Sequence, residues 1–272
     1  MFMEEIDING LSIAYNRYGS GNVTLLLIHG SYIDQTYWVD QVRHFEKEYH
    51  VVTLDLAGHG KSGKNREQWN VELLADDVVE FIKKLDLKNI ILIGHSLAGS
   101  IILHVATKFP DPVIGFIGIE NFKNAARPLP EAYDNQVIEI LDNLKRDFAG
   151  TNEEYARMVL VTEHTPDKIS ERVVQDYRNA YEPMGQSIMP EIFIMDKTEK
   201  ALLPKLQLKL YLINVAYMPT NMEALVENVP NDFEVREIEG TSHYPMLENP
   251  VVFNETLEHV IQQILKNEAY KF

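Results

Sequence analysis

Residues 90–99 of the chain read Ile90-Ile91-Leu92-Ile93-Gly94-His95-Ser96-Leu97-Ala98-Gly99. The apolar residues 90–93 lead into a turn of mostly small residues around Ser96, and the largely apolar stretch 100–106 that follows is typical of a buried helix. A serine held at a sharp turn between a strand and a helix is presented above a sheet as a nucleophile. The helix N-terminus favours negative charge near the same point. We therefore expect a strand, a tight turn carrying Ser96, and a helix.

Composition restricts the class of protein and its partners. The chain has 272 residues, of which 45% are hydrophobic and 24% charged. That length fits one large α/β domain or two small ones, with enough apolar residues for a core that folds alone. The formal net charge of −16 argues against nucleic acid or an anionic membrane surface as a partner. The chain contains no cysteine, so disulfides, thiolate metal sites and a cysteine nucleophile are excluded.

Neither a membrane span nor a signal peptide is visible in the sequence. The longest apolar runs, such as residues 25–28, are far shorter than the roughly 18 residues that a span needs. The acidic segment 1–7 lacks the basic and apolar regions of a signal peptide. We expect a soluble cytoplasmic protein that acts on a small molecule, with no nucleic acid or membrane partner. The sequence leaves the oligomeric state open.

The order of the remaining elements predicts the fold class. Alternating apolar residues flank Asn9-Gly10, which predicts a hairpin over residues 6–15. Further strands are expected at residues 23–28, 51–55, 113–119, 209–213 and 233–238. Helices are expected after Asn70, a good N-cap, after Ser96, and after Asn249-Pro250. Strands that alternate with helices indicate an α/β fold with a mostly parallel sheet and helices on both faces.

This alternation is interrupted between residues 121 and 206, where no convincing strand is present. Helical patterns cover residues 137–148, 153–161, 170–181 and 187–197, and Thr165-Pro166 is typical of a helix start. We therefore predict a core domain formed by residues 1–120 and 207–272, and an all-helical insertion formed by residues 121–206.

Four motifs together resemble the α/β-hydrolase superfamily. They are His29-Gly30, the loop Asp55-Leu56-Ala57-Gly58-His59-Gly60-Lys61-Ser62, the turn 94–99, and the segment 240–250 around His243. Their order and spacing match the family over nearly the whole chain apart from the helical insertion, which is similar in position to the family's lid, or cap. Ala98 departs from the glycine of the family's serine pentapeptide, but alanine is small enough for close packing. We interpret the loop 55–62 as structural.

The resemblance implies that Ser96 is the nucleophile and His243 its base. A serine hydroxyl is a poor nucleophile until a neighbouring base takes its proton. His243 lies in the loop after the last expected strand, where the family's base sits, and it satisfies the chain order nucleophile, acid, histidine. The histidine that precedes Ser96, His95, is interpreted as packing at the turn.

The acid of the triad has three candidate solutions. In most of the family the acid follows the strand expected at residues 209–213, but residues 214–221 contain no carboxylate. In a minority the acid lies one strand earlier, where Glu120 directly follows residues 113–119. A carboxylate at either strand end could orient the imidazole. We favour Glu120, with Glu223 or a dyad without an acid as alternatives.

The remaining site residues follow from the same resemblance. The backbone N–H groups of Leu97 and Ser31 are expected to hold the oxyanion of acyl transfer. An apolar pocket is expected from side chains near the catalytic turns and in the insertion: Tyr32, Trp38, Phe122, Ile188, Met189, Phe193, Tyr217 and Met218. No metal-ligand spacing, phosphate-binding loop or dinucleotide fingerprint is visible, so we expect neither a metal nor a cofactor.

The sequence thus favours a serine hydrolase with a Ser-His-Glu triad that cleaves a carboxylic ester or lactone of a small, largely apolar substrate. Two alternatives stay open. The same triad resembles that of carbon–carbon bond hydrolases, lyases and cofactor-free dioxygenases. Some signalling receptors with slow turnover are also similar in fold and triad.

Overall fold

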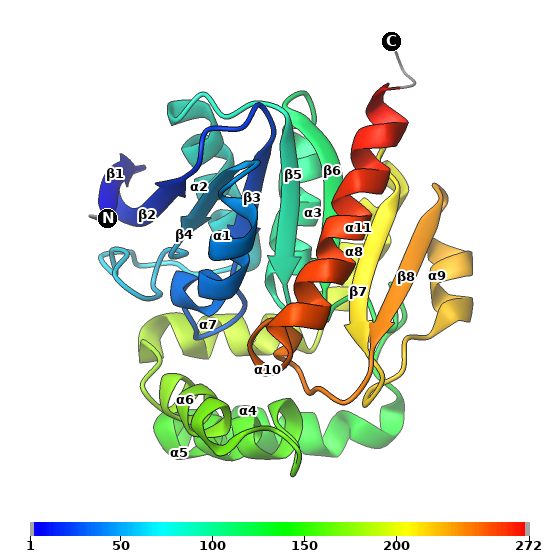
Figure 1. The fold of residues 1–272 in the computed structure, drawn as a ribbon. Coiled ribbons are helices and arrows are strands. Elements are labelled where there is room, and N and C mark those ends of the chain that lie inside the picture. Colours follow the sequence, from blue (N-terminus) through cyan, green and yellow to red (C-terminus); the bar gives the residue numbers. More distant parts are fainter. Residues whose placement is uncertain (1–2, 270–272) are drawn as a thin grey trace.

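The computed structural model describes residues 3–269, and its centre is an eight-stranded sheet with the strand order β1-β2-β4-β3-β5-β6-β7-β8 (Figure 1). The strands are β1 (Glu4–Ile8), β2 (Leu11–Tyr18), β3 (Thr24–Ile28), β4 (His50–Leu54), β5 (Ile90–His95), β6 (Val113–Ile119), β7 (Leu210–Val215) and β8 (Phe233–Ile238). The strands from β4 to β8 in this order pair in parallel, whereas β1–β2 and β2–β4 are antiparallel. The expected α/β fold class, with its mostly parallel sheet, is confirmed.

The hairpin at the start of the chain forms as its turn residues dictate. Asn9 and Gly10 both have positive φ, at 53° and 82°, which is the geometry that a two-residue hairpin turn needs. Asparagine and glycine are the residues that adopt it at least cost. The turn therefore sets the antiparallel register of β1 and β2, with Ile8 opposite Leu11.

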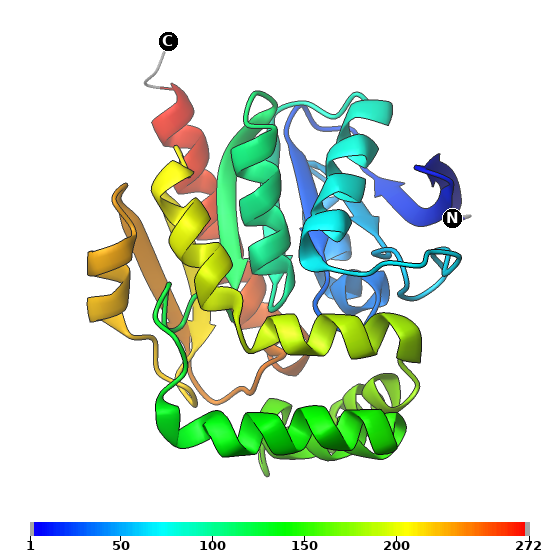
Figure 2. The ribbon, with the colours of Figure 1, turned by 180° about the vertical axis from the view of Figure 1, so that it is seen from behind.

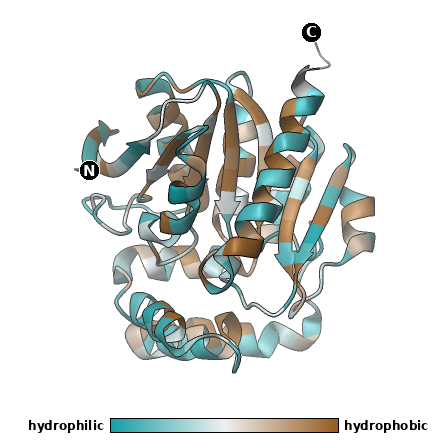
Figure 3. Cartoon of the chain, viewed as in Figure 1, coloured by the Kyte–Doolittle hydropathy of each residue, from teal (hydrophilic) through white to brown (hydrophobic). Residues whose placement is uncertain are grey.

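Helices cover both faces of the sheet (Figures 1 and 2). One layer contains α1 (Val39–Phe45) and α11 (Pro250–Ala269), and the opposite layer contains α2 (Val71–Lys84), α3 (Ala98–Lys108) and α8 (Met195–Leu202). Strands β3 and β5 are buried along their whole length, because they lie in the middle of the sheet between the two layers. Figure 3 shows the same pattern as a band of hydrophobic central strands.

The segment between β6 and β7 contains only helices and turns, in agreement with the absence of strand patterns there. Helices α4 (Asp134–Arg146), α5 (Phe148–Tyr155), α6 (Asp167–Arg178) and α7 (Glu182–Ile192) lie across the end of the sheet at which the parallel strands finish (Figure 1). The last helix, α8, packs against α3 instead (Figure 2). Whether the core and the insertion are two domains stays a prediction.

Two details of the insertion differ from the sequence-based expectation. The expected helix over residues 187–197 is two helices, because α7 contains Pro190, which has no N–H to donate, and ends two residues later. The sequence predicts Thr165 as a helix N-cap and Pro166 as the first helical residue, but helix α6 begins one residue later. Pro166 is the N-cap of α6, and its carbonyl accepts from Ile169 at 2.8 Å and from Ser170 at 3.0 Å.

Several hydrogen bonds fix the insertion to the rest of the fold. The Tyr32 hydroxyl donates to the Gly185 carbonyl of α7 at 2.9 Å, and the Val71 N–H at the start of α2 donates to the Glu191 carboxylate at 2.8 Å. This carboxylate therefore satisfies one free N–H at a helix N-terminus, where negative charge is also favourable. No helix among residues 3–269 combines the length and the apolar character that crossing a membrane would require.

The side chain of Asn70 caps the N-terminus of α2. The Asn70 side chain accepts from the Leu73 N–H at 2.7 Å, as the sequence predicts for a cap at this position. We expect Asn70→Ala to lower the free energy of unfolding by about 1 kcal/mol, since this N–H loses its acceptor. Urea unfolding measures the change. Asn22→Ala is the control, because the exposed Asn22 lies outside any helix; equal effects of the two changes would contradict the capping role.

Candidate active site

Ser96 occupies a strained turn between β5 and α3. Its φ is +54°, in the left-handed region that a non-glycine residue rarely adopts. The Ser96 N–H donates to the Ile119 carbonyl at 2.8 Å, and the Ser96 carbonyl accepts from the Gly99 N–H at 2.8 Å. Gly30 packs directly against this turn: a Cβ there would lie 3.0 Å from the Ser96 Cβ. The end of β3 therefore approaches the serine as closely as a glycine allows.

Glu120 occupies a second strained turn, at the end of the neighbouring strand β6. Its φ is also +54°, and its N–H donates to the Ile213 carbonyl of β7 at 3.1 Å. The side chain is only 1% exposed. One carboxylate oxygen, Oε1, accepts from the Val215 N–H at 2.6 Å and lies 2.9 Å from the Lys123 Nζ.

The other oxygen of Glu120 meets the histidine that the sequence analysis assigned as the base. His243 Nδ1 lies 3.2 Å from Glu120 Oε2, within hydrogen-bond reach. His243 Nε2 is buried, and no described residue between 3 and 269 accepts from it or donates to it. Because Nδ1 faces a carboxylate, Nδ1 carries the proton in the neutral ring, and Nε2 is left as a free acceptor.

The alternative acid lies elsewhere. Glu223 is in the first turn of α9 (Met222–Asn228), its side chain is 88% exposed, and its carboxylate lies 4.0 Å from the Arg127 guanidinium. The structure thus brings Glu120, and not Glu223, to His243. The dyad without an acid does not describe this arrangement, since a carboxylate lies against the ring.

His95 supports the loop that carries the base. Its Nε2 lies 2.8 Å from the His243 carbonyl, and because a carbonyl can only accept, Nε2 carries the proton. Burial, together with the neighbouring His243, lowers the pKa of His95 well below its usual value, so the ring stays neutral. His95 therefore holds the His243 backbone and does not serve as a second base. The sequence likewise suggested that His95 packs at the turn.

A pair of buried asparagines, which the sequence analysis did not identify, ties the two strained turns together. The Asn121 N–H donates to Asn214 Oδ1 and the Asn214 amide donates to the Asn121 carbonyl, both at 3.2 Å. The Asn121 amide also donates to the Gly94 carbonyl at 2.9 Å, at the end of β5. The sequence indicates their role only by their positions, because both asparagines lie at the carboxyl ends of adjacent parallel strands.

One cavity of about 260 Å³ contains the reactive groups of this region. Ser96, His243, Glu120 and Ser31 all line it, together with side chains of α5, α8 and the loops after β6 and β7. Of the expected pocket residues, the cavity is lined by Phe122, Phe193, Tyr217 and Met218. Its exposed wall is mainly apolar, with aromatic and aliphatic groups from both the sheet side and the insertion.

The other expected pocket residues lie outside this cavity. Trp38, Ile188 and Met189 are completely buried, so they pack in the core where α7 and the loop after β3 meet the fold. Tyr32 lines a separate cavity of about 160 Å³ beside His59. The sequence could not separate these residues from the true lining, because core and pocket walls use the same apolar and aromatic side chains.

The expected oxyanion donors lie on the two sides of the serine. Leu97 precedes the first turn of α3, and Ser31 follows the close contact between Gly30 and Ser96. Neither N–H is used in the hydrogen bonds that join loops, turns and side chains of residues 3–269. Both groups therefore stay free to donate to an anion beside Ser96.

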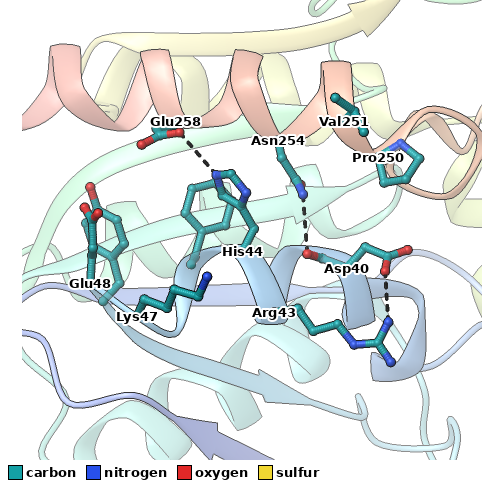
Figure 4. Close-up of a pocket in the computed structure, with 11 residues that line it drawn as sticks. Asp40, Arg43, His44, Lys47, Glu48, Pro250, Val251, Asn254 and Glu258 are labelled. Atoms are coloured by element: carbon teal, nitrogen blue, oxygen red, sulfur yellow. Dashed lines mark hydrogen bonds and ion pairs between the residues drawn. The ribbon is translucent and has the colours of Figure 1, made fainter.

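Another cavity lies apart from the groups around Ser96 and shares no lining residue with the cavity there. It measures about 500 Å³ and lies between α1 and α11 (Figure 4). Its wall contains many polar and charged side chains, and two of the contacts among them are His44 Nε2 with the Glu258 carboxylate at 3.2 Å and Arg43 with Asp40 at 3.3 Å. The smaller cavity at Ser96 is the one in which a base, a carboxylate and a hydroxyl converge.

Comparison with known proteins agrees with this geometry. The sequence model of the Alpha/beta hydrolase family matches residues 25–256. The chain belongs to the α/β-hydrolase family. Among solved structures, an esterase from Thermogutta terrifontis has a TM-score of 0.81 at 22% identity, with 97% of this chain and 99% of that chain covered. A hydrolase from Oleispira antarctica has a TM-score of 0.80 at 21% identity, covering 91% and 94%.

Sequence relatives are similar over shorter stretches. The (E)-2-((N-methylformamido)methylene)succinate hydrolase of Acinetobacter baylyi is 34% identical over 105 residues, which are 39% of this chain and 40% of that protein. Epoxide hydrolase 4 of Mus musculus is 31% identical over 133 residues, or 48% and 35% of the two chains. The chain thus spans less than half of the length of these curated relatives. The family is therefore established, and the reaction is not fixed by these relatives.

The α/β-hydrolase loop 55–62 behaves as a structural element. The Asp55 carboxylate accepts from the Gln35 N–H at 2.9 Å and from the Lys61 N–H at 2.8 Å. His59 Nδ1 lies 3.0 Å from the Ala57 carbonyl, and the ring is buried. Burial is the main cause that lowers the pKa of His59 from 6.5 to about 3.

This buried histidine predicts a loss of stability in acid. The unfolded chain binds a proton at His59 near pH 6.5, whereas the folded chain does so only near pH 3, so stability falls as the pH decreases between these values. From pH 7 to pH 5 the contribution amounts to about 2 kcal/mol. Between pH 7 and pH 5, the free energy of unfolding of the parent should fall by about 2 kcal/mol more than that of His59→Gln. Urea unfolding at both pH values measures the two changes. Equal losses would contradict the assignment.

Proposed function

We propose that this α/β-hydrolase is a serine hydrolase that cleaves a carboxylic ester or lactone of a small, largely apolar substrate. The observation that carries the proposal is the contact of His243 Nδ1 with Glu120 Oε2 at 3.2 Å, in the wall of the cavity that Ser96 also lines. A base oriented by a carboxylate, with its other nitrogen free, is the arrangement that activates a hydroxyl.

The geometry supports a two-step reaction. His243 Nε2 takes the Ser96 proton while the Ser96 Oγ attacks the substrate carbonyl, and the oxyanion accepts from the Ser31 and Leu97 N–H groups. His243 then donates the proton to the leaving alcohol as the C–O bond breaks, which leaves an acyl-enzyme. Water, deprotonated by the same nitrogen, releases the acid and restores Ser96. Throughout, Glu120 stabilises the imidazolium.

The cavity supports a substrate of modest size. At about 260 Å³ it lies just below the usual range for sites of drug-sized ligands, roughly 300–1,000 Å³. Its apolar wall suits an acyl chain or an aromatic ring, and the buried tyrosines remain protonated because burial raises the pKa of Tyr155 to about 12. A neutral, mainly apolar ester fits this environment better than an anionic one, given also the net charge of −16.

Substitution of the triad gives the decisive test. We expect Ser96→Ala to abolish labelling by a serine-directed fluorophosphonate and hydrolysis of short chromogenic esters. Glu120→Gln keeps the shape of the side chain but can no longer hold the imidazole in the productive tautomer, so kcat should fall by a factor on the order of 10³–10⁴. Steady-state kinetics across an ester panel measures both effects.

The matched control is Glu223→Gln, which removes the exposed alternative acid and should leave kcat within a factor of about two. Equal losses in the two glutamate variants would refute the assignment of Glu120. Labelling of Ser96→Ala at the parent rate would refute the nucleophile. Failure of every ester to give an acyl-enzyme burst would favour carbon–carbon bond cleavage or slow-turnover ligand binding instead.

A further inference from the structure

Lys123 lies against the carboxylate that orients the base. Its Nζ is 2.9 Å from Glu120 Oε1, and it donates to the carbonyls of Met218 at 2.6 Å and Val215 at 3.3 Å. The same ammonium lies 5.1 Å from the centre of the Tyr217 ring, a cation–π distance. The Lys123 side chain is only 17% exposed, and it lines the cavity at Ser96. These contacts give the ammonium a single defined position.

We propose that Lys123 is a positioning residue for the triad, which fixes Glu120 so that Oε2 faces His243, and that its positive charge opposes protonation of the His243 ring. This proposal rests on the proposed function of the site for its meaning in catalysis. The contacts of Lys123 and His243 with the two oxygens of Glu120 are present whatever reaction the site catalyses.

The division of the carboxylate between its partners supports the positioning role. Glu120 Oε1 is held by Lys123 and the Val215 N–H, so the plane of the carboxylate is fixed before Oε2 meets the ring. A buried carboxylate with a single partner could rotate about its last torsion, which is broad for glutamate. Lys123 also reaches the loop after β7 through two carbonyls, and thereby connects the ends of β6 and β7.

The charge of Lys123 has a second effect. The positive charge that His243 gains during the reaction is stabilised by Glu120, but a fixed cation on the other oxygen of the same carboxylate weakens that stabilisation. Protonation of His243 outside the reaction is opposed in the same way.

Other groups around His243 do not substitute for this charge. His95 stays neutral because its pKa is lowered, and Tyr217 and Tyr244 stay neutral because burial raises their pKa values. Glu248, in the helix that follows the base, accepts from the Ser242 N–H at 3.0 Å and is the same in every variant considered below. Besides Lys123, the titratable groups of the insertion that line the cavity are Arg127, Tyr155, Tyr177, Asp196 and Glu199.

Lys123→Gln tests the proposal, because glutamine retains N–H donors for the two carbonyls but has no charge. We expect the NMR titration of the His243 ring, identified by its loss in His243→Asn, to move to higher pH, because a nearby positive charge disfavours the protonated ring. The acid limb of the kcat/KM profile for ester hydrolysis should move by the same amount, with KM nearly unchanged. Lys123→Met should produce the same shift and a lower kcat, since it also loses the donors. Lys123→Arg keeps the charge and should restore the parent titration.

Lys83→Met is the matched control. Lys83 forms an ion pair with Glu80 at 2.7 Å with the same spacing of three residues, but both side chains are well exposed, at 45% and 38%. It should leave the His243 titration and the kcat/KM profile unchanged. A His243 titration that stays in place in folded Lys123→Gln and Lys123→Met overturns the proposal. If the parent protein hydrolyses no ester but the titration still moves, the proposed function fails and the role of Lys123 stands.

Discussion

The hydrogen bonds of the parallel sheet extend by one residue beyond each of two neighbouring strands, and the candidate site depends on this extension. The Ser96 N–H donates to the last residue of β6, and the Glu120 N–H donates to Ile213 of β7. Each bond fixes a residue with a φ of +54° directly after its strand. Ser96 and Glu120, the proposed nucleophile and acid, are therefore held by the same ladder, one strand apart, and His243 approaches Glu120 from the loop after β8. Such left-handed residues cost on the order of 1–3 kcal/mol each.

Close packing and hydrogen bonds from the surrounding side chains hold both turns in this strained conformation. The Asn121 side chain fills the space beside Gly118 and Gly99, where a larger residue would collide with it. It binds the Gly94 carbonyl, while Asn214 binds the Asn121 backbone from the next strand. These buried polar groups are hydrogen-bonded to one another, so displacement of either turn would leave donors and acceptors unpaired, at roughly 1–3 kcal/mol each. The glycines and asparagines thus serve the same geometry as the triad.

Local sequence signals predicted the parts of the structure that local physics determines. The hairpin at Asn9-Gly10, the cap at Asn70 and the strand, turn and helix around Ser96 follow from turn geometry, capping and apolar runs. The family resemblance, together with the absence of a carboxylate from residues 214–221, predicted Glu120 as the acid. The roles of Asn121 and Asn214 depend on partners on other strands, and that of Lys123 depends on the conformation of the loop after β6, for which the sequence has no periodic signal. Trp38, Ile188 and Met189 are buried and do not line the cavity at Ser96, because its lining depends on how the helical insertion packs, which no local pattern encodes.

The insertion supports the base as well as covering the cavity. Helix α5 continues into a single π-helical turn over Ala156–Leu160, and such turns are frequent at functional sites. The Leu160 carbonyl of this turn accepts from the His243 N–H at 3.4 Å, and the Val159 carbonyl accepts from the Tyr217 hydroxyl at 3.1 Å. Tyr217 in turn lies under the Lys123 ammonium that binds Glu120. The insertion therefore contacts the His243 imidazole by two routes, directly through the backbone of His243 and indirectly through Tyr217, Lys123 and Glu120.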